Sequence, residues 1–419
     1  MTTIDGRTTR LADVDLYNPD NFVDGVPYHL FKILREEAPV YRHPEPYGPG
    51  FWALTKYDDV VKVSLDSATF SSELMGTNIP DPPEDSLAFL RMIMLNMDPP
   101  KHTKYRRLVS KGFTPKIVLA MEPHVRKTAN EIIDRVAERG ECDFVNDIAA
   151  ELPLQVILEL MGIPVEDRHM VFEWSNRMIG FDDPEYQSSP ADGQAAATQM
   201  FMYANQLAVD RKQHPRDDVI STLMSAEVDG EALTEAEFNA FFVLLSVAGN
   251  ETTRNLTSGG MLALVEHPDQ RDRLLADPSL VPTAVEEMLR WVTPVIYFRR
   301  TVTRDTEIRA QKIGEGEKVV MYYGSANRDE DVFPNADVFD VSRDPNPHVT
   351  FGPGGSHFCL GASLARLEIR VMFEELLRRL PDIELAGPIR RLRSNFIAGI
   401  KQMPVRFSAE ASAQTKGRT

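Results

Sequence analysis

The spacing of apolar residues along the chain predicts a protein built mainly from helices. In five segments, apolar side chains recur every three or four residues, which places them on one face of an α-helix. These segments are Val118–Gly140, Leu152–Met161, Glu237–His267, Pro282–Trp291 and Gly361–Leu380. Runs typical of β-strands are short, namely Phe51–Leu54, Ile296–Thr301, Lys318–Tyr323 and Ile397–Ile400. The pattern therefore predicts a mainly α fold with a small β portion.

One long segment, Ala326–Gly355, follows neither pattern. Four prolines interrupt it, with Asn and Asp between them. An irregular stretch of this length inside a compact protein is usually functional. No repeat and no Gly/Ser linker divides the chain, so we expect one domain over residues 1–419, with loosely held ends at 1–10 and 409–419.

Composition narrows the class of protein. The chain has 63 acidic and 46 basic residues and a net charge of −17, which disfavours nucleic acid as a partner. The N-terminus lacks the apolar core of a signal peptide. The longest apolar stretch, Phe241–Gly249, is about half of what a membrane crossing needs. We therefore expect a cytoplasmic protein that does not span a membrane.

The most informative string is FGPGGSHFCLG, residues 351–361. Its glycines permit backbone angles that let the chain turn tightly against a flat object. Cys359 stands at the start of a predicted helix, whose N-terminus favours the thiolate form. From these residues alone, three other interpretations remain: a small buried apolar residue, a phosphate-binding loop without the GxGxxG spacing, or a zinc site whose second cysteine, Cys142, is far away in the sequence.

The whole string resembles the haem-thiolate loop of the cytochrome P450 family, commonly FGxGxHxCxG, with one extra residue between Gly354 and His357. The resemblance, closest to soluble bacterial members, extends over residues 17–407. It implies the cytochrome P450 fold, with haem b held between the long central helix and the helix after the cysteine. It makes Cys359 the axial ligand of the iron and Phe351 a haem contact.

Two further motifs fit this resemblance. Glu287 and Arg290 stand at i and i+3 of a predicted helix and match the family's ExxR pair, which holds a further arginine. Arg343, in the string FDVSR, supplies that arginine. The resemblance implies a structural role for these three residues, in fixing the loop that presents the cysteine.

Haem carries two propionates, so its site should offer cationic donors. His102 and Arg106 lie at i and i+4 of one predicted helix face, Arg300 lies on a predicted strand, and His357 lies two residues before the cysteine. The resemblance assigns all four to the propionates. Singly, each also fits an ordinary surface cation.

The long helix opens with TEAE, residues 234–237, which forms a capping box, and it carries AGNETT in its middle. Glycine and small polar residues weaken a helix and allow a kink beside a ligand. By resemblance, Ala248 and Gly249 contact the haem, Glu251 relays protons, and Thr252 hydrogen-bonds the dioxygen. A tolerated polar interruption is the alternative.

The implied activity is that of a haem-thiolate monooxygenase, which inserts one oxygen atom of O2 into a C–H bond. Electrons would come from NAD(P)H through ferredoxin reductase and ferredoxin. We expect ferredoxin to dock on a group of basic residues, although an ordinary solvated helix face is the alternative. This group comprises Lys101, Lys104, Arg106, Arg107 and Lys111.

The segments that line the family's pocket are rich in large apolar side chains, which suit a large apolar substrate, unless they are core residues. The candidates are Leu95, Met97, Met178, Leu244, Val295 and Ile296. The strings VAGNETTRN, SANRDE and RDPNPH resemble the branch that hydroxylates terminal (omega) methyl groups of methyl-branched lipids, fatty acids and sterol side chains.

Three alternatives stay open. A polyketide or terpenoid hydroxylase would belong to the same family. A peroxide-driven peroxygenase usually lacks the acid–alcohol pair that Glu251 and Thr252 form. A non-catalytic haem-binding sensor would bind a ligand and form no product.

Overall fold

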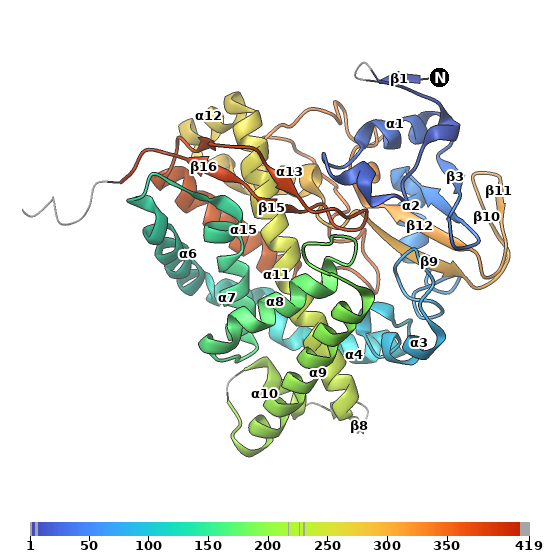
Figure 1. The fold of residues 1–419 in the computed structure, drawn as a ribbon, viewed down its shortest axis with the longest axis horizontal. Helices are drawn as coiled ribbons and strands as arrows, with labels where there is room; N and C mark the ends of the chain where they lie inside the picture. Colours follow the sequence, from blue (N-terminus) through green and yellow to red (C-terminus); the bar gives the residue numbers. More distant parts are fainter. Residues whose placement is uncertain (1, 5–6, 217, 226, 229–230, 411–419) are drawn as a thin grey trace, which may run out of the picture.

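The computed structural model describes residues 2–4, 7–216, 218–225, 227–228 and 231–410. Helices make up most of the molecule, and the largest sheet lies at one side of it (Figure 1). The predicted mainly α fold with a small β portion is confirmed. At the N-terminus, where we expected a loose end, Thr2–Ile4 (β1) pairs with Arg7–Thr9 (β2). Residues 411–419 of the expected C-terminal tail lie outside the described part.

The remaining elements follow one another along the chain without an obvious repeat. The helices are α1 Tyr28–Glu37, α2 Tyr57–Leu65, α3 Glu84–Leu90, α4 Lys101–Ser110, α5 Pro115–Ala120, α6 Glu122–Ala137, α7 Glu151–Leu160, α8 Arg168–Ile179, α9 Pro190–Gln213, α10 Val219–Met224, α11 Glu235–Glu266, α12 Pro268–Ala276, α13 Val281–Val292, α14 Tyr323–Ala326 and α15 Ala362–Arg379. The strands are β3 Val40–His43, β4 Phe51–Leu54, β5 Phe70–Ser71, β6 Glu141–Asp143, β7 Glu227–Val228, β8 Glu231–Ala232, β9 Tyr297–Val302, β10 Thr306–Ile308, β11 Gln311–Ile313, β12 Lys318–Tyr322, β13 Glu384–Leu385, β14 Arg390–Arg391, β15 Ile400–Gln402 and β16 Pro404–Arg406.

Four of the five predicted helices, now α7, α11, α13 and α15, form within two residues of their predicted ends. The fifth, Val118–Gly140, is divided at Met121 into α5 and α6. Pro123 near the start of α6 explains the division, because proline has no N–H to donate and its ring clashes with the preceding turn.

Helix α11 is the central element of the fold. Its 32 residues span about 48 Å. The predicted capping box is present: the Thr234 hydroxyl accepts the N–H of Glu237 at 3.3 Å, and the Glu237 carboxylate accepts the N–H of Thr234 at 3.0 Å. The helix packs against α7, α8, α9, α13 and α15. Side chains on α11 therefore face several parts of the interior at once.

The largest sheet has the strand order β3-β4-β12-β9-β5. Strands β4 and β12 run parallel, with Phe51 opposite Lys318, and the other pairs are antiparallel. Three predicted strands form its centre. The fourth, Ile397–Ile400, was misplaced: the strand begins at Ile400, whereas Ile397 makes an isolated bridge with Val295.

The segment predicted to be irregular contains neither helix nor strand from residue 327 to residue 361. It lies between α14 and α15, and some of its side chains, such as Phe333, Phe339 and Val341, are buried. The chain thus reaches the cysteine by a long irregular path, which needs side-chain contacts to fix it.

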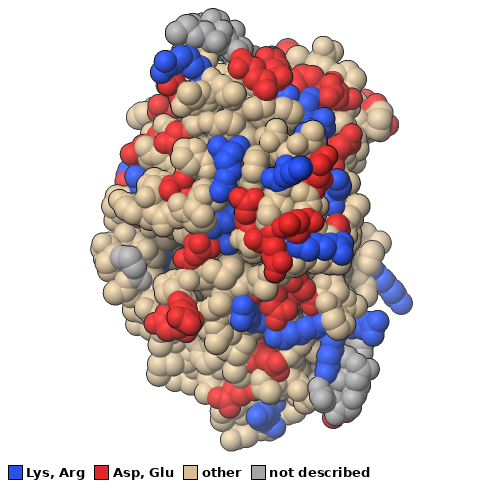
Figure 2. All heavy atoms as spheres, turned by 90° about the vertical axis from the view of Figure 1, so that its right-hand side faces the viewer, with Lys and Arg blue, Asp and Glu red and all other residues tan. Residues whose placement is uncertain are grey.

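Although the chain is acidic overall, acidic and basic side chains are mixed on its surface. On the face in Figure 2, Lys and Arg side chains are interleaved with Asp and Glu, and neither sign covers the face alone. Within the described part of the chain, no helix is both long and apolar enough to cross a membrane.

Candidate functional site

A cavity lies between α11 and the segment that leads into α15, and the thiol of Cys359 faces it. Twelve of the predicted site residues line this cavity together. They are Leu95, His102, Arg106, Leu244, Ala248, Gly249, Thr252, Val295, Arg300, Phe351, His357 and Cys359.

Besides the three structural residues Glu287, Arg290 and Arg343, four predicted residues do not line it. Met97 is fully buried in the core, and Met178 packs against the core from α8. Ile296 lines a second cavity instead. Glu251 lies on α11 outside the lining of the first cavity. Large apolar residues in the predicted pocket segments thus lie either in the pocket wall or in the core, and the elements that they pack against decide which.

Glycines shape the loop before Cys359. Gly352, Gly354 and Gly355 have φ values of +83°, +121° and +76°, which residues with side chains rarely adopt. The Cys359 N–H donates to the Phe351 carbonyl at 2.8 Å and closes the loop. The string therefore presents the sulfur through backbone geometry that only glycine allows at low cost.

The environment of the Cys359 thiol differs from the sequence expectation. Burial raises its pKa, and the opposing influences of the Gly361 N–H, Arg106 and Arg366 are smaller. The start of α15 therefore does not make a free thiolate by itself. A coordinating metal ion removes the proton from a thiol, so the site favours the thiolate only as a ligand.

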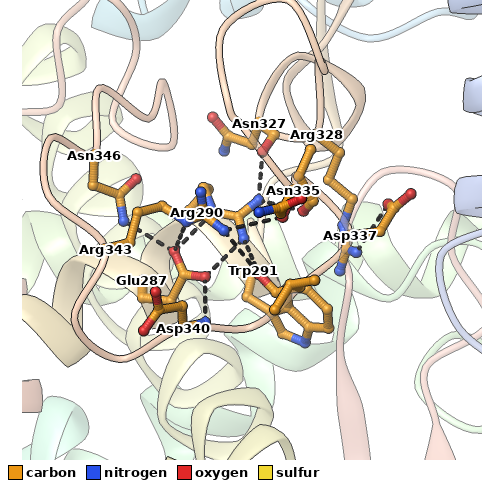
Figure 3. Close-up of polar contacts among 12 residues, drawn as sticks. Glu287, Arg290, Trp291, Asn327, Arg328, Asn335, Asp337, Asp340, Arg343 and Asn346 are labelled. Carbon is orange, nitrogen blue, oxygen red and sulfur yellow. Dashed lines mark hydrogen bonds and ion pairs between the residues drawn. The ribbon is translucent and has the colours of Figure 1, made fainter.

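Figure 3 shows how Glu287 gathers the groups around it. Its carboxylate accepts from Arg290 Nε at 2.8 Å and Nη2 at 2.7 Å, and from Arg343 Nε at 3.1 Å. The Asn346 side chain and the Asp340 N–H donate to the same carboxylate at 3.0 and 2.9 Å. Three residues predicted to act together therefore meet in one buried network.

The same arginines hold the irregular segment. Arg290 Nη1 donates to the carbonyls of Asn327 and Ala336 at 2.9 and 2.8 Å, and Arg343 Nη1 donates to that of Pro334 at 2.8 Å. These bonds tie the segment before the cysteine loop to α13. Without them, little regular hydrogen bonding would fix its path.

Four basic groups meet at one end of the cavity. The rings of His102 and His357 are 4.2 Å apart, centroid to centroid, and His102 Nδ1 is buried without a partner. Arg106 Nη1 donates to the Ser356 carbonyl at 3.0 Å. Arg300 is only 3% exposed.

These groups disfavour one another's charge. Burial, followed by Arg106, lowers the pKa of His102 to about 4, and burial, followed by Arg300, lowers that of His357 to about 2. An anionic ligand would relieve this crowding. A thiol, a group of cations at one end and apolar walls together fit a haem with its two propionates.

The α11 wall carries Ala248, Gly249 and Thr252. The Thr252 hydroxyl donates to the Ala248 carbonyl at 2.9 Å. A Cβ on Gly249 would come within 2.7 Å of the Ile157 side chain of α7. The α-helix continues through this point, and Gly249 allows the close approach of α7. The expected kink stays a prediction.

Glu251 is buried and held by its own helix. One carboxylate oxygen accepts from Arg254, and the other has no partner. Arg254 Nη1 also donates to the Asn176 side chain of α8 at 3.0 Å. Burial raises the pKa of Glu251, and Arg254 opposes this shift. Glu251 is therefore adjacent to Thr252 in sequence, but its carboxylate points to Arg254.

Glu368 was missed by the sequence analysis. It lines the cavity from α15, is 2% exposed, and burial raises its pKa to about 8. The acid thus keeps its proton near neutral pH. Its signal was present in the sequence, because it follows Leu364 by four residues and occupies the apolar face of the helix.

Comparisons with known proteins found related sequences. The sequence profile of the family described as Cytochrome P450 matches residues 155–381. The steroid C26-monooxygenase of Rhodococcus jostii is 44% identical over 402 residues, which cover 94% of this chain and 84% of the relative. The methyl-branched lipid omega-hydroxylase of Mycobacterium tuberculosis is 45% identical over 410 residues, which cover 95% of both chains.

A solved structure shares the fold. The Mycobacterium marinum cytochrome P450 in complex with pseudoionone superposes with a TM-score of 0.86 at 43% identity, and the match covers 91% of this chain and 94% of that one. The likeness extends well beyond the cavity, over nearly all of the chain.

Proposed function

This chain belongs to the cytochrome P450 family and is a monooxygenase, and we propose that it hydroxylates a terminal methyl group of a methyl-branched lipid, fatty acid or sterol side chain. Two relatives of 44–45% identity carry names for reactions of this kind. The observation that carries the proposal is the charge distribution in the cavity of this chain.

A large part of the cavity wall is apolar. It includes Met94, Leu95, Leu244, Leu245, Val295 and Phe298. Each CH₂ group that such a wall buries contributes about 0.8 kcal/mol. A hydrocarbon chain end gains from this wall, whereas a carboxylate or other charged head would meet no partner among these six side chains and would remain outside.

Bound haem b supplies the activation of O2 for insertion of one oxygen atom into a C–H bond. Cys359 is proposed to ligate the iron, and His102, Arg106, Arg300 and His357 to hold the propionates. The Thr252 hydroxyl, already at the cavity wall, is proposed to donate a hydrogen bond to the oxygen substrate.

Glu251 is proposed to supply protons to Thr252. To do so its carboxylate has to turn away from Arg254, and its unpartnered oxygen is free to bind water. The Arg254–Asn176 hydrogen bond links this movement to α8, since Asn176 lies on that helix.

Enzymes of this family take electrons from a redox partner, and we infer that here the donors are NAD(P)H, ferredoxin reductase and ferredoxin. Near the cysteine loop, Arg107 is exposed and Phe358 is 37% exposed. Arg106 is directed to the loop instead of the surface. Arg107→Glu should slow reduction by ferredoxin and leave substrate affinity unchanged, whereas Lys312→Glu on the β10–β11 hairpin should change neither. Equal reduction rates in both variants would remove this docking site.

The substrate proposal is tested by spectral titration of the haem-loaded protein and by product analysis. The panel should contain branched fatty acids, 3-keto steroids, terpenoids and polyketides. We expect the first two classes to bind and to yield terminally hydroxylated products with a ferredoxin system. Products from terpenoids or polyketides alone would overturn the substrate class, faster turnover with hydrogen peroxide would favour a peroxygenase, and binding without product would indicate a sensor.

A further inference from the structure

A second cavity of about 250 Å³ lies further along α11, toward its C-terminal end. It is separated from the haem cavity by residues 294–296: Val295 lines the haem cavity, and Ile296 lines the second one. Residues of the N-terminal region, α11, α13 and the β14–β15 hairpin form its other walls. None of the functions proposed above uses this space.

Two polar groups line this cavity without partners. Asn255 of α11 is 1% exposed, and neither atom of its amide makes a hydrogen bond. Arg391 of β14 is partly exposed, and its guanidinium makes no hydrogen bond or ion pair with any other described residue. Buried polar groups are normally satisfied, so the amide in particular indicates a missing partner.

A third donor comes from Arg328. Its guanidinium lies between the rings of Tyr28 and Trp291, 3.8 and 3.7 Å from their centroids, and its Nε has no hydrogen-bond partner. Its ion pair with Asp337 is long, at 3.7 Å (Figure 3). Burial lowers the pKa of Arg328 and Arg290 adds to this shift, whereas Tyr28 and Asp337 oppose it. The positive charge is therefore only partly compensated.

The balance of donors and acceptors defines the ligand. Asn255 Nδ2, Arg328 and Arg391 offer N–H groups, and Asn255 Oδ1 adds one unpartnered acceptor. The carboxylates that line the cavity, Asp24 and Glu266, are exposed. Much of the remaining wall is apolar, with residues such as Leu262, Ile296 and Ile397. Water could satisfy the amide, but it would not neutralise two guanidinium groups. A carboxylate accepts charge-assisted hydrogen bonds from both groups.

We propose that this cavity is a second binding site, which takes a small carboxylate with a short apolar chain, about the size of butyrate. The carboxylate is held by Arg328, Arg391 and the Asn255 amide, and the apolar chain lies against Ile296 and Leu262. The inference does not depend on which substrate the haem cavity takes.

The test is calorimetric titration of the haem-loaded enzyme with butyrate, butyramide and butylamine. Butyrate should bind saturably, the neutral amide at least tenfold more weakly, and the amine not at all. The Soret band should stay unchanged, because the site is separate from the haem cavity. Equal binding of butyrate and butyramide, absence of saturation at tens of millimolar, or a Soret shift that accompanies binding would each overturn the proposal.

Variants locate the site. Arg391→Gln and Asn255→Leu should each weaken butyrate binding at least tenfold. Arg390→Gln is the matched control, because it removes the same charge from the neighbouring position of β14, outside the cavity lining. Haem content and circular dichroism check that each variant is folded. If all three variants bind butyrate equally, the cavity is not the binding site. If Asn255→Leu does not fold, the comparison of butyrate binding by Arg391→Gln and Arg390→Gln decides whether the cavity is the site.

Discussion

The surroundings of Glu287 and the middle of α11 are both buried and polar, yet their polar atoms are used in opposite ways. All side-chain oxygen and nitrogen atoms of Glu287 and Arg290 make hydrogen bonds. On α11, the amides of Asn250 and Asn255 are buried with no partner on either atom.

The two regions are therefore suited to different roles: the Glu287 network to a structural role, and α11 to binding and proton transfer. A satisfied buried network has one favoured arrangement, so the Glu287 network fixes the path of the chain to Cys359. The unpartnered groups on α11 can still form hydrogen bonds with water or a ligand. One region fixes the loop of Cys359, the proposed haem ligand, and the other contains the groups that we propose to take part in proton transfer.

The largest effect should come from removing Cys359, whose loop the Glu287 network holds in place. Cys359→Ala deletes the thiol at the cavity and should abolish both the thiolate absorption of the reduced CO complex and all hydroxylation. Cys142→Ala is the control: Cys142 lies on β6, and burial raises its pKa to about 12, so its loss should leave both measurements nearly unchanged. Residual hydroxylation in Cys359→Ala would exclude the proposed ligand.

Breaking the support itself should have the next largest effect. Glu287→Gln leaves Arg290 and Arg343 without their carboxylate, and removing one partner of a buried ion pair costs about 3–5 kcal/mol of unfolding free energy. Urea denaturation and the ratio of Soret to protein absorbance measure the loss of stability and of haem. Glu384→Gln removes an exposed carboxylate paired with Arg406, so it should cost about 1 kcal/mol or less. Equal losses in both variants would contradict a special role for Glu287.

On α11, Thr252→Ala should lower the amount of product formed per electron and increase the amount of hydrogen peroxide released. The reason is that the cavity loses a hydroxyl donor. The effect should be several-fold in coupling, with substrate affinity little changed. Thr257→Ala is the control, since its hydroxyl makes the same bond to the carbonyl four residues earlier, at 2.9 Å, but does not line the cavity. NAD(P)H, product and peroxide are measured together. Tight coupling in Thr252→Ala would count against its role.

The last prediction concerns the pH dependence of stability. Burial raises the pKa of Glu368 from 4.5 to about 8, so the folded protein holds a proton there that the unfolded chain releases. Stability should therefore fall as pH rises from about 5 to 8, and Glu368→Gln should flatten this slope. Urea unfolding at pH 5, 6.5 and 8 measures it. Glu374→Gln, on the same helix but paired with Arg126 and Arg370, should keep the slope. Identical slopes for all three proteins would refute the assignment.

Much of the fold was predictable because its signals are local. Helices α7, α11, α13 and α15 follow from three- and four-residue spacing, and the capping box at Thr234 marks where α11 begins. The glycines before Cys359 indicate a tight loop, because only their backbone adopts those angles cheaply. The spacing of Glu287 and Arg290 already places them on one helix face.

What only the tertiary structure decided concerns where each side chain points and what it meets. Thr252 and Glu251 are adjacent in sequence, yet one lines the cavity and the other pairs with Arg254. Met97 belongs to the core, and Ile296 belongs to the second cavity. Burial, and with it the pKa of a carboxyl or the lack of a partner, depends on elements distant in sequence, so no local pattern contains it.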